Sequence, residues 1–176
     1  MKAEKKRWTE NFALGIAVLV VALCAGVFGI GGSKASDFAE KPLNYYEQSM
    51  AADFTAREAA ADTILTLAKS SGGDAALIAD AQAGLEHSRA AQSPAERYRA
   101  GNEMKLAVEL LYQSLAEDER DSKGSAAQMA WSEFTSRTAI LSHSIPEYNA
   151  LVQEVQSAAD GFPGSLLIRT HLEKMR

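Results

Sequence analysis

The chain has 176 residues, of which 47% are hydrophobic, and its formal net charge is −5. This length suits one globular domain with an anchoring segment, and the hydrophobic content is too low for a protein that crosses a membrane many times. The acidic balance argues against nucleic acid as a partner, because phosphate binding needs a broad basic face. The single cysteine, Cys24, excludes an internal disulfide and a cysteine-based metal site.

A basic tail and a long apolar run begin the chain. Residues 1–11 carry four basic and two acidic side chains, a net charge of +2, which leaves −7 for the remainder. Residues 12–30 read FALGIAVLVVALCAGVFGI without a charge, which is close to the length that crosses a hydrocarbon core of about 30 Å. The positive-inside rule places residues 1–11 in the cytoplasm. We therefore expect a single-pass signal anchor in a bacterial inner membrane, with an extracytoplasmic (periplasmic) body.

Two other interpretations of this segment are open. Ser33-Lys34-Ala35 loosely fits the small-x-small pattern of a signal-peptide cleavage site, but the apolar run is longer than the usual h-region of such peptides. A lipoprotein is the third interpretation, and it is disfavoured because the bulky Leu23 precedes Cys24. A retained anchor fits the length of the run best.

Two predicted elements follow the anchor. Residues 31–41 are expected to form a linker, opened by the flexible run Gly-Gly-Ser-Lys-Ala-Ser. An amphipathic helix then starts near Asp37 or Pro42 and runs to about Ser70, with apolar residues at steps of three and four.

Turn and capping signals define the next two helices. The second helix follows the turn Ser-Ser-Gly-Gly-Asp and stops near Gln92. A capping box, Ser93-Pro94-Ala95-Glu96, opens a third helix that runs to about Glu117. The second and third segments could alternatively form a single kinked helix.

The last long helix starts near Ser125 and carries a heptad seam. Its apolar positions alternate steps of four and three, at Phe134, Thr138, Leu141, Ile145, Tyr148, Val152, Val155 and Ala159. Pro146 lies one residue off this seam and should kink the helix. No run shows sustained alternation, so no sheet is expected. The predicted fold is all-α: a transmembrane helix and then an antiparallel, up-and-down bundle of three to four long helices over residues 42–176.

A spaced motif occupies the C-terminal part of this helix. Tyr148-Asn149 begins it, Val152 takes an apolar place, and Phe162-Pro163 closes it. The residues and their spacing resemble the pattern YNxxVxxYNxxIxxFP of the LemA family, a group of membrane-anchored bacterial helical proteins. The second Tyr-Asn pair of that pattern is replaced in this chain by Val155-Gln156.

A second segment carries the same resemblance. The run AGNEMKLAVELL, with Asn102 and Glu103 near its start, is similar to the family's AENELxxALxxLL segment. The family's early IPNL-type motif is not visible around residues 63–68, which read TILTLA. The chain therefore resembles a short, divergent member. The resemblance implies an inner-membrane-anchored helical bundle with proposed links to envelope proteases and membrane organisation, and it assigns no catalytic residue.

The residues point to binding rather than catalysis. No nucleophile-elbow, P-loop, HExxH or dinucleotide motif is visible, and no Glu-x-x-His pairs suit a di-metal bundle. We expect no catalytic, cofactor-binding or metal-binding residues, and we interpret the motif residues as structural. The predicted function is a non-enzymatic, membrane-anchored scaffold or adaptor that binds envelope or membrane proteins or copies of itself. The alternative is an extracytoplasmic four-helix-bundle ligand sensor acting through a partner protein. A hydrolase with scattered catalytic residues is a third, disfavoured hypothesis.

Overall fold

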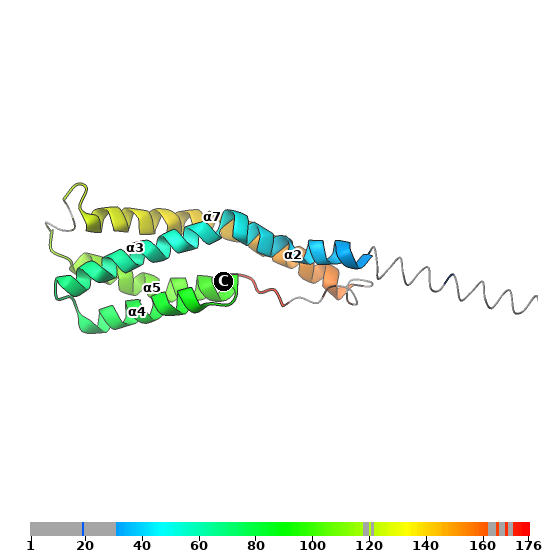
Figure 1. Ribbon diagram of the computed structural model, residues 1–176, viewed down its shortest axis with the longest axis horizontal. Coiled ribbons are helices and arrows are strands. Elements are labelled where there is room, and N and C mark those ends of the chain that lie inside the picture. Colours follow the sequence, from blue (N-terminus) through cyan, green and yellow to red (C-terminus); the bar gives the residue numbers. More distant parts are fainter. Residues whose placement is uncertain are drawn as a thin grey trace, which may run out of the picture. The chain divides into compact units, whose positions relative to one another are not determined.

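A computed structural model describes Leu19 and residues 31–117, 120, 122–161, 165, 168 and 171–176. Five helices and no strand are present in this part of the chain. They are α2 (Gly31–Ser49), α3 (Ala51–Ser70), α4 (Ala75–Ala90), α5 (Pro94–Ser114) and α7 (Ala126–Asp160), as drawn in Figure 1. The predicted all-α class and helical bundle are confirmed.

The predicted membrane anchor falls on a part of the chain that the structure does not describe. Residues 1–11 lie wholly outside the described residues, and residues 12–30 lie outside them apart from Leu19. None of the helices that are described is long and apolar enough to cross a membrane. The anchor therefore stays a prediction from the sequence.

The chain divides into two compact units. One unit comprises Met1–Glu40 and Val155–His171, and it includes the N-terminal part of α2 and the C-terminal end of α7. The other comprises Lys41–Glu154 and Leu172–Arg176, and we refer to it as the bundle unit. The bundle unit contains α3, α4 and α5 completely and most of α7. Every site described below lies within it.

Two boundaries differ from the prediction at the start of the described chain. The expected flexible link is helical, because α2 begins at Gly31 and continues through Pro42. The run from Lys34 to Glu40 suits a helix, and cooperative propagation carries the helix back into the glycines. The predicted continuous helix to Ser70 is interrupted at Met50, which separates α2 from α3 with a φ of −131°. No glycine or proline marks this break, so the sequence pattern gave no signal for it.

α4 and α5 form a helical hairpin, and the capping signals predicted for them are confirmed. Asp74 caps α4, and the capping box of α5 is complete: the Glu96 N–H donates to Ser93 Oγ at 3.2 Å and the Ser93 N–H donates to the Glu96 carboxylate at 3.1 Å. The two helices approach closely at Gly84, where an added Cβ would lie 2.5 Å from the Cβ of Met104. They are separate, packed helices, so the alternative of one kinked helix is wrong.

The predicted seam of α7 packs into the bundle. Between Phe134 and Val152 every seam position is buried or half-buried. The helix runs through Pro146 without interruption. Trp131, one heptad before Thr138, stacks on Tyr112 with ring centroids 4.7 Å apart and packs against the core.

The core of the bundle unit consists of two clusters of buried side chains. The first cluster joins α3, α4, α5 and the N-terminal half of α7, and its largest members are Ile64, Leu65, Leu85, Met104, Val108, Leu111, Leu115 and Phe134. The second cluster comprises Tyr46, Met50, Phe54, Leu141, Tyr148, Val152 and Met175. Met175 comes from the end of the chain, which is not helical there.

Candidate functional site

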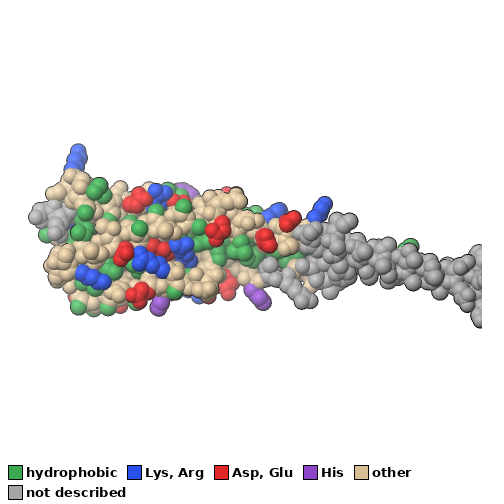
Figure 2. Space-filling view, in the orientation of Figure 1, with side chains coloured by type: hydrophobic (Ala, Val, Ile, Leu, Met, Phe, Trp, Pro, Cys, Tyr) green, Lys and Arg blue, Asp and Glu red, His purple; other side chains and the backbone are tan. Residues whose placement is uncertain are grey.

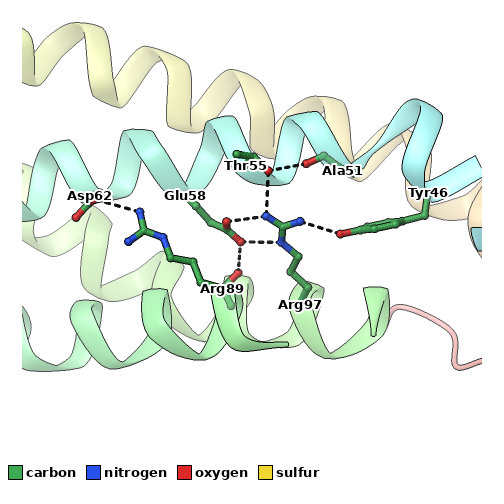
Figure 3. A network of polar contacts seen from close by, with 8 residues as sticks. Tyr46, Ala51, Thr55, Glu58, Asp62, Arg89 and Arg97 are labelled. Carbon is green, nitrogen blue, oxygen red and sulfur yellow. Dashed lines mark hydrogen bonds and ion pairs between the residues drawn. The ribbon is translucent and has the colours of Figure 1, made fainter. Parts of the chain in front are cut away.

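A charged pair is buried between α3 and α5. Arg97 on α5 donates from Nε and Nη2 to the two carboxylate oxygens of Glu58 on α3, at 2.8 and 2.7 Å (Figure 3). The Glu58 and Arg97 side chains are only 5% and 18% exposed. A planar, two-point contact of this kind fixes both groups in position and in orientation.

Three hydroxyl groups complete this pair. Ser88 on α4 donates to Glu58 at 2.6 Å, while Arg97 donates to the hydroxyls of Tyr46 and Thr55 at 2.9 and 3.1 Å. The guanidinium carbon of Arg97 also lies 5.4 Å from the centre of the Phe54 ring. The network therefore ties α2, α3, α4 and α5 together at one level of the bundle unit (Figure 3).

The pair holds both of its groups in the charged form. Burial by itself would raise the pKa of Glu58, but hydrogen bonds from Arg97 and Ser88 and the positive charge of Arg97 outweigh it, so the pKa lies below its usual value. The hydrogen bond to Glu58 raises the pKa of Arg97 against the opposing effect of burial. Removing either side chain would leave the charge of the other one buried and without its partner.

Arg57 is buried on α3, next to Gly101 of α5. It is 1% exposed, it donates from Nη2 to the backbone oxygen of Gly101, and its guanidinium carbon lies 5.5 Å from the Phe134 ring centre. Among the described residues its Nε has no hydrogen-bond partner. Burial lowers the pKa of the Arg57 side chain, although the charge of Glu58 acts in the opposite direction. Gly101 admits the guanidinium, because an added Cβ there would lie 2.8 Å from Nη2.

A pocket of about 380 Å³ opens beside the charged pair. Its walls come from α2, α3, α4 and α5 and include Glu47, Glu58, Arg89 and Arg97. The two acidic and two basic side chains balance, and both arginines are engaged: Arg97 with Glu58, and Arg89 with Asp62 at 3.0 Å. A polar ligand could enter only by competing with these existing contacts.

A groove of about 380 Å³ lies between α4 and α5. Its apolar lining includes Leu77, Leu106 and Leu110, and the latter two are 64% and 39% exposed. Acidic residues border it from both helices, Asp80 on α4 and Glu103 on α5. Exposed leucines one turn apart along a groove are the usual form of a site for a partner helix.

The structure brings three of the seven motif residues together. Tyr148 and Val152 are buried in the second cluster, and Asn149 beside them makes two hydrogen bonds to the backbone of Met175, both 2.8 Å long. Burial raises the pKa of Tyr148 to about 12. Asn149 thus holds Met175 beside the cluster that contains Tyr148 and Val152.

The other motif residues lie elsewhere. Asn102 and Glu103 are exposed on α5, and Glu103 borders the α4–α5 groove. Phe162 and Pro163 are outside the described residues. The motif residues therefore do not form a single site in the part of the chain that the structure describes.

No family model, curated protein or solved structure matches this chain. The LemA resemblance therefore depends on the two sequence segments alone. Within the described residues, no group of three or more His, Cys, Asp or Glu side chains is placed to hold a metal ion.

The motif search missed the buried charges. Arg57 occupies a core position of α3, because the spacing Phe54, Arg57, Ala61, Ile64 continues the apolar steps of three and four. An arginine at such a position was a usable signal that a polar group lies in the core. Glu58, Ser88 and Arg97 carried no comparable signal, since each resembles an ordinary surface residue of a helix.

Proposed function

We propose that this protein is a non-enzymatic, membrane-anchored scaffold or adaptor whose helical bundle binds other envelope proteins. The α4–α5 groove supports this proposal most directly. We propose that it receives an amphipathic helix of the partner, with an apolar face against the leucines and basic residues along the sides.

The chemistry of the groove selects this occupant. Leu106 and Leu110 are spaced by one helical turn, so they suit apolar residues of a partner helix at the same spacing. Asp80 and Glu103 lie on opposite walls, so basic flanking residues would be attracted from both sides. Acidic and basic side chains are interspersed with exposed apolar atoms on the face drawn in Figure 2. In the α4–α5 groove, by contrast, the carboxylates that flank the leucines, Asp80 and Glu103, are both acidic.

The proposed location comes from the sequence. The basic tail and the uncharged run of residues 12–30 support a signal anchor, with the bundle on the outer side of the inner membrane. We propose further that the chain is a short, divergent relative of the LemA family, on the two segments that resemble it.

A titration with designed helical peptides tests the groove. The purified chain is mixed with a fluorescent amphipathic peptide built from leucine and lysine, and binding is followed by anisotropy at low and moderate salt. We expect saturable binding that weakens as salt rises, because part of the attraction is electrostatic. A peptide of the same pattern built from leucine and glutamate should bind at least ten-fold more weakly.

Matched substitutions locate the site. Leu106→Glu with Leu110→Glu should abolish binding, because the two charges would face the apolar side of the peptide. Met129→Glu is the control, because Met129 is similarly exposed, at 59%, but belongs to α7. Equal binding to both variants, or equal binding of both peptides to the parent chain, would show that the groove is not the site.

The polar pocket favours the ligand sensor as a second candidate function. Its charged walls lie between helices, where a small polar metabolite could bridge Glu47 and Arg89. A thermal-shift screen with small charged metabolites tests this candidate. Stabilisation that persists in Leu106→Glu but disappears in Arg89→Ala supports a sensor, and no stabilisation by any compound counts against it.

A further inference from the structure

The last five residues of the chain dock on the bundle unit as a non-helical segment. Within Leu172–Arg176, Met175 is 2% exposed and belongs to the second cluster, while Arg176 on its C-terminal side is exposed. Asn149 on α7 donates from Nδ2 to the Met175 oxygen and accepts the Met175 N–H at Oδ1. One carboxamide thus satisfies both backbone groups of one residue.

The contact with Asn149 and the contact of the Met175 side chain have different roles in holding the segment. The Asn149 contact involves only the backbone of Met175, so it fixes the position of the segment without depending on the side chain of that residue. Selection comes from the apolar site that receives the Met175 side chain, formed by Tyr46, Met50, Phe54, Leu141, Tyr148 and Val152. We call this site, together with Asn149, the segment site.

Charged and polar contacts flank the methionine. Glu173 lies 3.6 Å from Arg99 on α5, and Lys174 donates to Gln153 on α7 at 2.9 Å. Both contacts are exposed, so each contributes little by itself. The segment is therefore held by the buried Met175 side chain, by the half-buried Leu172 side chain that packs against the second cluster, and by one pair of backbone hydrogen bonds. An attachment of only five residues can open locally.

The segment site is built from helices and does not need its own chain end. Its apolar members come from α2, α3 and α7 and from Met50 at the α2–α3 break, and the surface that Met175 covers would be exposed to water if the segment left. An equivalent segment would then be recruited, because covering these side chains is favourable. Eleven residues, 161–171, separate α7 from the segment along the chain.

We propose that the segment site is a recognition site for a non-helical peptide containing a buried methionine, and that it accepts Leu172–Arg176 from a second copy of this chain. Each copy carries both the site and the segment, so two copies exchange segments reciprocally and form a closed, symmetric pair. The second copy is the occupant because its segment has the shape, hydrogen bonds and flanking charges already present in the structure.

Cross-linking between differently tagged full-length chains tests the exchange. Cys24→Ala is introduced in all chains, Gln153→Cys in one tagged chain and Lys174→Cys in the other, since these two side chains are in contact. The chains are mixed, incubated and treated with a short bismaleimide. We expect a covalent product that carries both tags, and its yield should fall at least ten-fold when Met175→Glu is added to the chain with Lys174→Cys.

A chain that carries both cysteines is the internal control. Reaction within this chain, without any two-tag product in the mixture, would show that the segment stays on its own bundle and would overturn the proposal. A two-tag product whose yield is unchanged by both Met175→Glu and Asn149→Ala would also overturn it, because the contact would then arise elsewhere. Circular dichroism verifies that each variant keeps its helices.

Discussion

The two clusters of the bundle unit are closed in different ways. The first cluster is enclosed by four helices, and its members are mostly alanine, leucine and other aliphatic residues. The second cluster is richer in aromatic residues, and a five-residue segment supplies part of its cover. The difference teaches that one bundle unit can combine a core enclosed by helices with a core that is covered in part by a short non-helical segment.

Each cluster also has its own arginine. Arg97, over the Phe54 ring of the second cluster, has a full set of partners centred on Glu58. Arg57, near the Phe134 ring of the first cluster, has one backbone acceptor and an unpartnered Nε. Arg97, with its carboxylate partner, should stabilise the folded state. Arg57 should contribute little to the free energy of unfolding or lower it.

Breaking the buried pair should have the largest effect. Glu58→Ala leaves the Arg97 charge buried without its carboxylate, so we expect the free energy of unfolding to fall by about 3–5 kcal/mol. Urea denaturation followed by circular dichroism measures it. Asp62→Ala is the control, because its ion pair with Arg89 is about half exposed and should be worth less than about 1 kcal/mol. Equal losses in the two variants would contradict the assignment of Glu58 to the core.

Truncating one side chain in each cluster tests the contrast directly. Leu111→Ala in the first cluster should cost about 2–5 kcal/mol, because no element can leave to relieve the cavity. Met175→Ala should cost only about 1–2 kcal/mol, since the loss is limited by the free energy of docking the segment. The same urea experiment measures both values. A larger loss for Met175→Ala than for Leu111→Ala would show that the segment is integral to the fold.

Acid should reduce the contribution that Glu58, the partner of Arg97, makes to stability. The folded-state pKa of Glu58 is lowered, so its contribution to stability is complete above the unfolded value of about 4.3 and is lost as the pH falls through the folded value. We expect the difference in urea midpoint between the parent chain and Glu58→Gln to be constant from pH 7 to about pH 5. The difference should shrink below about pH 4. A difference that grows in acid would contradict the sign of the pKa shift.

Substitution of Arg57 should have the smallest effect on the free energy of unfolding. Arg57→Met removes a buried charge and retains most of the side-chain volume, so the free energy of unfolding should change by less than about 1 kcal/mol or increase. Thermal and urea unfolding measure this change. A loss above about 3 kcal/mol would mean that the contacts with Gly101 and Phe134 are worth more than the buried charge costs.

Periodicity and capping chemistry predicted most of the fold. The seam of α7, the capping box of α5 and the turn before α4 all rest on local rules that tertiary contacts did not override. The break at Met50 and the helical start of α2 were not predictable, because Met50 has no local signal and the Gly-Gly-Ser run reads as flexible.

The sites were less predictable than the helices. The partner of Asn149 lies 26 residues along the chain, in a segment that is not helical, and no local pattern links the two. The pairing of Glu58 with Arg97 joins residues 39 apart, and no sequence rule specifies which surface-like charges meet in a core. The α4–α5 groove depends on helix packing at Gly84, which only the structure reveals.

Photo-crosslinking from position 106 in native membranes tests the proposed scaffold function most directly. A photoreactive amino acid replaces Leu106 in the full-length chain, and the crosslinked peptide is identified by mass spectrometry, with position 129 as the matched control site. The account predicts one partner peptide, obtained only from position 106, that is an amphipathic helix with leucine-rich and basic faces. Identical products from both positions, or crosslinks confined to soluble cytoplasmic proteins, would contradict it.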